Sequence, residues 1–116
     1  MQIDDLSAKV YSPELHIGVD ARSIGWLGNT VPVSGMLPSH AIEALRSLRA
    51  QAFHDDGDMG LHECQICRQH AESGELWLEC GAIRYVAPAM ILHYCEMHSY
   101  LPPKEFVAAL LDWADG

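Results

Sequence analysis

Two cysteines separated by two residues are the feature of this sequence that most constrains its fold. Cys64 and Cys67 can share a tight turn that points both sulfurs at one metal ion, and such a pair is the usual first half of a tetrahedral zinc site. A second group of ligand-type residues follows in the segment from His93 to His98, with 25 residues between Cys67 and His93. The sequence therefore predicts one zinc ion per chain, held between these two segments.

The second segment offers two different ligand pairs. Cys95 and His98 are three residues apart and share one face of an ideal helix, so helix geometry favours this pair. His93 and His98 are five residues apart, a spacing that zinc sites tolerate but that requires the helix to distort near its end. His93 and Cys95 point to different faces and should not bind the same ion.

His62 and Cys80 are further candidates outside these two segments. His62 lies two residues before Cys64 and could bind the metal or hydrogen-bond one of its ligands. Cys80 alternates with Leu76 and Leu78 in a strand-like run, so we expect a buried thiol there. A thioredoxin-like redox role for the cysteine pair would need a βαβ setting, which the pattern lacks.

Hydrophobic periodicity predicts the elements around these segments. Alternation indicates strands in the early part of residues 16–27, at 31–33, and in a hairpin formed by 75–80 and 82–86. Helical periodicity indicates helices at residues 39–53 with Ser39 as N-cap, at 89–99 with Pro88 in the first position, and at 104–113.

These elements predict the class of fold. A chain of 116 residues suits one domain, and we expect a small α+β domain over residues 1–116 with β-hairpins and about three helices. The order of cysteine knuckle, hairpin and helix predicts a treble-clef-like zinc element at about residues 60–100. The acidic loop with Asp55, Asp56 and Asp58 lacks the later Gly and distal Glu of an EF-hand, so calcium is not expected.

The charge balance restricts the kinds of partner. The chain has 7 basic and 16 acidic residues, which gives a formal net charge of -9. Nucleic-acid phosphates are bound through clusters of Lys and Arg, and the sequence contains no basic run. We therefore expect no nucleic-acid partner, and an acidic surface that favours solubility or a basic protein partner. The oligomeric state stays open.

The sequence carries no recognisable targeting or membrane segment. Residues 1–11 lack the basic start and apolar run of a secretory signal, and no apolar run approaches the roughly 18 residues of a membrane span. We expect a cytoplasmic protein with no membrane partner, in which the four cysteines are metal ligands or buried thiols and not disulfides.

Three sets of residues carry a resemblance to a known group of proteins. They are Gly25-Trp26-Leu27, then Gly60, His62, Cys64 and Cys67, and a closing run with Tyr85, Ala87, Pro88, Ile91, His93, Tyr94, His98, Tyr100, Pro102, Pro103, Glu105 and Phe106. In this pattern, which covers about residues 18–111, the chain resembles a family of small bacterial proteins described as a domain of unknown function.

The resemblance bears on the choice of ligands. In that family the position of Cys95 is usually aliphatic, whereas His93 and His98 belong to the pattern. The resemblance thus implies the metal ligands Cys64, Cys67, His93 and His98, against the simple helix-face argument. It implies no activity, because the family has no assigned function.

Three functions are compatible with such a site. Four saturating ligands favour a structural site and a zinc-stabilised protein-interaction module without chemistry of its own. A zinc hydrolase or deaminase would need an open coordination position and a carboxylate such as Glu63 or Glu96, but the His-Glu-x-x-His and His-x-Glu patterns are absent. A thiol or metal sensor would use Cys95 as a spare thiol. We predict no catalytic residues and no enzyme activity.

Overall fold

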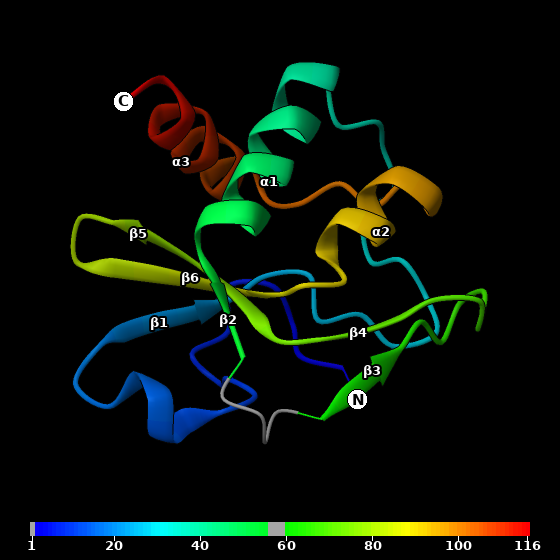
Figure 1. Ribbon diagram of the computed structural model, residues 1–116, viewed down its shortest axis with the longest axis horizontal. Helices are drawn as coiled ribbons and strands as arrows, with labels where there is room; N and C mark the ends of the chain where they lie inside the picture. The colour runs from blue at the N-terminus through cyan, green and yellow to red at the C-terminus, as the bar shows by residue number, and fades with distance from the viewer. Residues whose placement is uncertain (1, 56–59) are drawn as a thin grey trace.

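The fold is a small α+β arrangement in which three helices cover one face of a four-stranded sheet (Figure 1). The computed structural model describes residues 2–55 and 60–116. The strands of the sheet follow the order β1 (Asp20–Ser23), β6 (Ile83–Pro88), β5 (Glu75–Cys80) and β2 (Phe53–His54). Strand β1 runs parallel to β6, and the other pairs are antiparallel. The helices are α1 (Ser39–Gln51), α2 (Ile91–Met97) and α3 (Lys104–Asp115).

The main core lies between the sheet and the helices. Strand β5 contributes Leu76 and Leu78, which alternate along the strand and therefore point to the same face. Helix α1 buries Leu45 and Leu48 at helical spacing, and α3 adds Leu110. The predicted hairpin and the three predicted helices are thus confirmed, because their apolar periodicity matches the faces that are buried.

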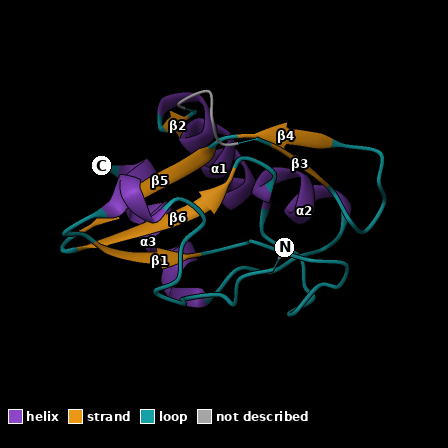
Figure 2. Cartoon of the chain, turned by 90° about the horizontal axis from the view of Figure 1, so that it is seen from below, coloured by secondary structure: helices purple, strands orange, loops and turns teal. Residues whose placement is uncertain are grey.

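The opposite face of the sheet is covered by the N-terminal segment, which includes the short 3-10 helix η1 (Pro13–His16) (Figures 1 and 2). Trp26 packs beside Val86 there, and its indole Nε1 donates a hydrogen bond of 3.0 Å to the Val86 carbonyl. Glu75 is also buried on this face. Its Oε1 accepts a 2.8 Å hydrogen bond from Trp77 Nε1 and lies 3.2 Å from His16 Nε2, which ties η1 to the sheet.

The ends of several elements differ from the sequence-based expectations. Pro88 closes strand β6 opposite Glu75, and α2 begins only at Ile91, so Pro88 is not the first residue of a helix. A strand end tolerates proline because its missing N–H removes a single ladder bond. The N-cap of α1 is Pro38, and Ser39 is the first helical residue without a capping bond from its side chain.

Two further expectations about strands are wrong. Residues 31–33 form no strand, and the segment that follows pairs only through an isolated bridge between Ser34 and Tyr100. The strand expected from residue 16 begins at Asp20, because His16 belongs to η1. The acidic loop considered for calcium includes Asp56 and Asp58, which lie outside the described residues.

Cys80 is exposed, contrary to the expected buried thiol. It shares a face with Leu76 and Leu78, but it is the last residue of β5, next to the hairpin turn at Gly81. Alternation predicts which face a side chain points to, and it does not predict where along the strand the helices stop covering that face.

The contrast between Leu78 and Cys80 generates a prediction about stability. We expect Leu78→Ala to lower the free energy of unfolding by about 2–5 kcal/mol, because it leaves a cavity in the core. Cys80→Ala, two residues along on the same face, should change it by less than about 0.5 kcal/mol. Urea unfolding followed by circular dichroism measures both, and equal losses would contradict this description of the sheet.

Candidate metal centre

A second, two-stranded sheet presents the cysteine pair at its tip. Strands β3 (Leu61–Glu63) and β4 (Ala71–Ser73) are antiparallel, and Cys64 follows β3 directly. The Cys64 N–H donates a 2.8 Å hydrogen bond to the His70 carbonyl, and the Arg68 N–H donates one of the same length to the Cys64 carbonyl. Arg68 adopts a φ of 56°, in the left-handed region. This tight turn, which we call the knuckle (residues 64–70), turns both cysteine sulfurs toward α2.

Helix α2 supplies the two histidines by ending between them. His93 lies within the helix, whereas His98 is its C-cap, with a φ of −127°, and Ser99 follows with a φ of 53°. The His98 N–H still donates to the Tyr94 carbonyl at 3.1 Å. Because the helix stops at this point, the His98 side chain is free to turn back toward His93. The distortion that the five-residue spacing requires is therefore the normal end of the helix.

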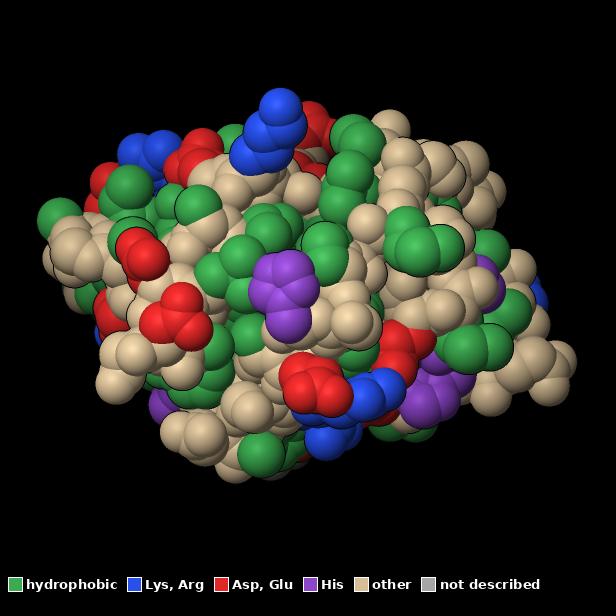
Figure 3. All heavy atoms as spheres, turned by 90° about the horizontal axis from the view of Figure 1, so that it is seen from above, with side chains coloured by type: hydrophobic (Ala, Val, Ile, Leu, Met, Phe, Trp, Pro, Cys, Tyr) green, Lys and Arg blue, Asp and Glu red, His purple; other side chains and the backbone are tan. Residues whose placement is uncertain are grey.

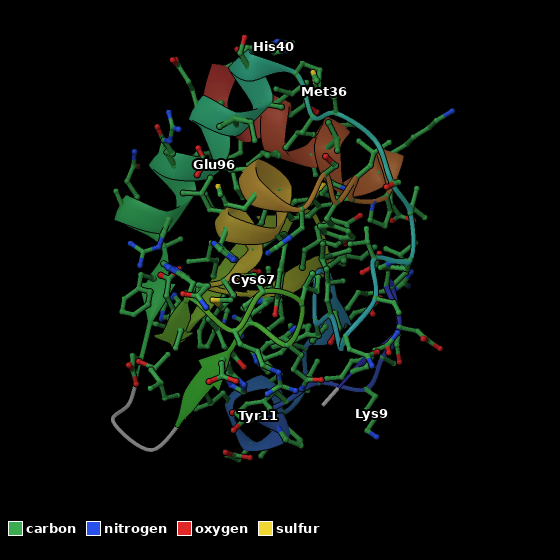
Figure 4. All side chains as sticks on the ribbon, turned by 90° about the vertical axis from the view of Figure 1, so that its right-hand side faces the viewer. Lys9, Tyr11, Met36, His40, Cys67 and Glu96 are labelled. Atoms are coloured by element: carbon green, nitrogen blue, oxygen red, sulfur yellow. The ribbon has the colours of Figure 1, made fainter. Side chains whose placement is uncertain are left out.

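The four side chains converge on one point. Cys64 Sγ lies 3.4 Å from His98 Nε2, and Cys67 Sγ lies 3.5 Å from His93 Nε2. The two Nε2 atoms are 3.2 Å apart. All four ligand-type atoms lie within 4.8 Å of one another, which is close enough to hold one metal ion. In Figure 4 the Cys67 side chain lies between the green knuckle and the yellow helix α2.

The other candidates from the sequence lie outside this cluster. Cys95 is only 7% exposed and packs in the main core, where burial raises the pKa of its thiol to about 12. The His62 ring packs edge-on against Tyr11 and Trp26, with centroid distances of 4.6 and 5.6 Å. Of the two schemes that spacing left open, the structure thus gathers the set with His93 and leaves Cys95 apart. Binding of a metal by this set stays a prediction.

An outer group of polar residues supports His93. The His70 ring stacks on the His93 ring with centroids 4.4 Å apart and an angle of 8° between planes. His70 Nε2 lies 2.7 Å from Glu72 Oε2, and Glu72 Oε1 accepts a 3.1 Å hydrogen bond from Arg49 Nε of α1. The search for metal-ligand spacing in the sequence does not single out this group. The i, i+2 spacing of His70 and Glu72 was the available signal, since it places both on one side of a strand.

The surroundings favour the metal-binding protonation state of His93. Burial is the main cause that lowers the pKa of His93, and the nearby His70 and His98 lower it further. A neutral imidazole is the form that can donate a lone pair to a metal. The pKa of Tyr94 is raised to about 12, mainly by burial and then by the neighbouring Cys64 and Cys67. That phenol therefore stays protonated at neutral pH.

The fold and the Cys/His cluster define a small α+β domain with a potential metal site. A family model described as Domain of unknown function (DUF7919) matches residues 1–111, and the chain belongs to this family. Neither the curated proteins nor the solved structures contain a match to the chain. Among the described residues, no helix is both long and apolar enough to cross a membrane.

The different environments of the cysteines predict different reactivities. In the folded protein a thiol reagent should label Cys80 first, because it is exposed, while Cys95 should react only on unfolding. Mass spectrometry of peptides after brief labelling measures this order. Cys80→Ser should abolish the fast phase, and rapid labelling of Cys95 in the folded protein would contradict the description of its burial.

Proposed function

We propose that Cys64, Cys67, His93 and His98 bind one structural zinc ion, and that the domain is a zinc-stabilised protein-interaction module. The observation that carries the zinc proposal is the set of distances between the ligand-type atoms. Zinc bonds of about 2.3 Å to sulfur and 2.0–2.1 Å to nitrogen give tetrahedron edges of about 3.3–3.4 Å between nitrogens and 3.5–3.6 Å between nitrogen and sulfur. The observed 3.2 Å between Nε2 atoms and the 3.4 and 3.5 Å from sulfur to nitrogen are close to these values.

The zinc would join two parts of a treble-clef-like element. The knuckle gives two ligands and the end of α2 gives two, with the β5–β6 hairpin between them in the chain. Strands β3 and β4 form a sheet of two strands, which is marginally stable without further support. Bonds from one zinc ion to both the knuckle and α2 supply that support. In small zinc units the binding of structural zinc contributes roughly 10–16 kcal/mol of apparent free energy to folding.

A closed, structural site is favoured over a catalytic one. Four protein ligands saturate tetrahedral zinc and leave no position for a water molecule. The two carboxylates considered for proton transfer both have other partners. Glu63 forms an ion pair with Arg68 at 3.1 Å, and Glu96 pairs with Arg46 of α1. Burial of Cys95 likewise disfavours a sensor that relies on its thiol.

The distribution of charge supports a basic protein as the partner. Each of the five arginines in the sequence is ion-paired with a carboxylate: Arg22 with Asp20, Arg46 with Glu96, Arg49 with Glu72, Arg68 with Glu63, and Arg84 with Glu79. Figure 3 shows this on one face, where basic side chains lie beside acidic ones. Since the arginines are engaged within the molecule, the charge left for a partner is mainly negative, which favours basic proteins and disfavours nucleic acid.

Metal analysis of purified variants tests the ligand set. We expect one zinc per chain in the unaltered protein and in Cys95→Ala, and loss of zinc in His93→Ala and His98→Ala. Elemental analysis on protein purified without chelator measures this, with circular dichroism as the control for folding. Zinc retained in His93→Ala, or no metal in the unaltered protein, would overturn the proposed site.

Removal of the metal should loosen a defined part of the chain. After treatment with a strong chelator, we expect amide hydrogen exchange to accelerate at least tenfold in residues 61–73 and 91–98, since the knuckle and α2 lose their common anchor. Exchange in the β5–β6 ladder should change least, because both its faces stay packed. Added zinc should reverse the effect, and uniform protection before and after chelation would contradict a structural metal.

A further inference from the structure

A groove beside the knuckle offers a second site. It has a volume of about 330 Å³, at the small end of the range for small-molecule sites. Its floor is formed by the buried side chains of Trp26, Leu27 and Pro88. Its rim comes from β3 and the knuckle, and includes Glu63 and Arg68. None of the four proposed zinc ligands lines it, so the groove is separate from the metal position.

A tyrosine hydroxyl without a protein partner distinguishes the groove from a plain surface depression. Tyr94 lines it and is only 4% exposed, and no other described residue forms a hydrogen bond with its hydroxyl. Two other tyrosine hydroxyls have hydrogen-bond partners among the described residues: Tyr85 donates to Glu105, and Tyr100 donates to Asp5. A hydroxyl that has no protein partner in the lining of a groove can form a hydrogen bond with a polar ligand there.

The rim of the groove carries one charge of each sign. Glu63 and Arg68 face each other at 3.1 Å, and both side chains are more than half exposed. An exposed pair of this kind contributes little to stability. Either member can therefore pair with a ligand instead, with little loss of folding free energy. An anionic ligand would pair with Arg68 and leave Glu63 uncompensated, and a cationic ligand would do the reverse. A zwitterion pairs with both.

We propose that this groove binds a small zwitterion with an apolar body, of the class of free α-amino acids with an aromatic side chain. The carboxylate pairs with Arg68, the ammonium group pairs with Glu63, and the ring lies against Trp26, Leu27 and Pro88. Tyr94 lines the groove, so its hydroxyl can form a hydrogen bond with a polar atom of the ligand. This ligand binding is a function beyond the proposed interaction module. It depends on the proposed zinc site only through the knuckle, which forms part of the rim of the groove.

Titration with phenylalanine and two derivatives tests the charge requirement. Zinc-loaded protein labelled with ¹⁵N should show saturable shifts at the Trp26 indole and at Arg68, with a dissociation constant on the order of 1 mM for a ligand of this size. N-acetylphenylalanine lacks the ammonium group and phenylalanine amide lacks the carboxylate, and each should bind about three- to fivefold more weakly. Equal binding of either derivative, or no saturable shift with phenylalanine, would overturn the proposal.

Matched variants locate the binding. Glu63→Gln, Arg68→Gln and Tyr94→Phe should each weaken phenylalanine binding about threefold or more. Asp20→Asn, which removes the carboxylate of the exposed Arg22 pair elsewhere, should leave it unchanged. Zinc content is measured on every sample. Zinc without phenylalanine binding overturns the groove proposal alone, and binding by protein that never contains zinc overturns the metal proposal alone.

Discussion

The antiparallel ladder between β5 and β6 is the constraint on which the rest of the structure depends. Its two strands are the central pair of the sheet, and both faces are covered. Leu76 and Leu78 hold the helices on one side, while Glu75 and Trp77 hold the N-terminal segment on the other. Because the ladder fixes the end of β6, it also fixes where α2 starts, and thereby the histidines.

The Cys/His cluster is a product of that chain path. Strand β4 follows the knuckle and leads through Gly74 into β5, and the hairpin partner of β5, strand β6, leads into α2, so the β5–β6 hairpin returns the chain from the knuckle to the histidines. Arg49 of α1 adds a third connection through Glu72 and His70, which stacks on His93. The candidate metal centre therefore lies where a hairpin, the main sheet and two helices come together.

Periodicity and ligand spacing predict much of this arrangement, and they fail at element ends. The β5–β6 hairpin, the three helices and the grouping of Cys64 and Cys67 with the His93 segment follow from local pattern. The boundary at Pro88, the exposure of Cys80 and the burial of Glu75 depend on how far one layer extends over another, which a single strand's pattern does not record. Helix-face geometry alone favoured Cys95, because it assumed a helix that continues past His98.

The residue at which α2 ends determines where the His98 imidazole lies relative to the other three members of the cluster. One residue inserted into α2 between His93 and His98 would rotate the His98 position by about 100° around the helix axis and move its imidazole away from Cys64. Ser99, which takes the left-handed conformation just after His98, lies beyond the end of α2 and outside the Cys/His cluster. A substitution that lengthens or shortens α2 can therefore change the Cys/His cluster without replacing any of its four residues.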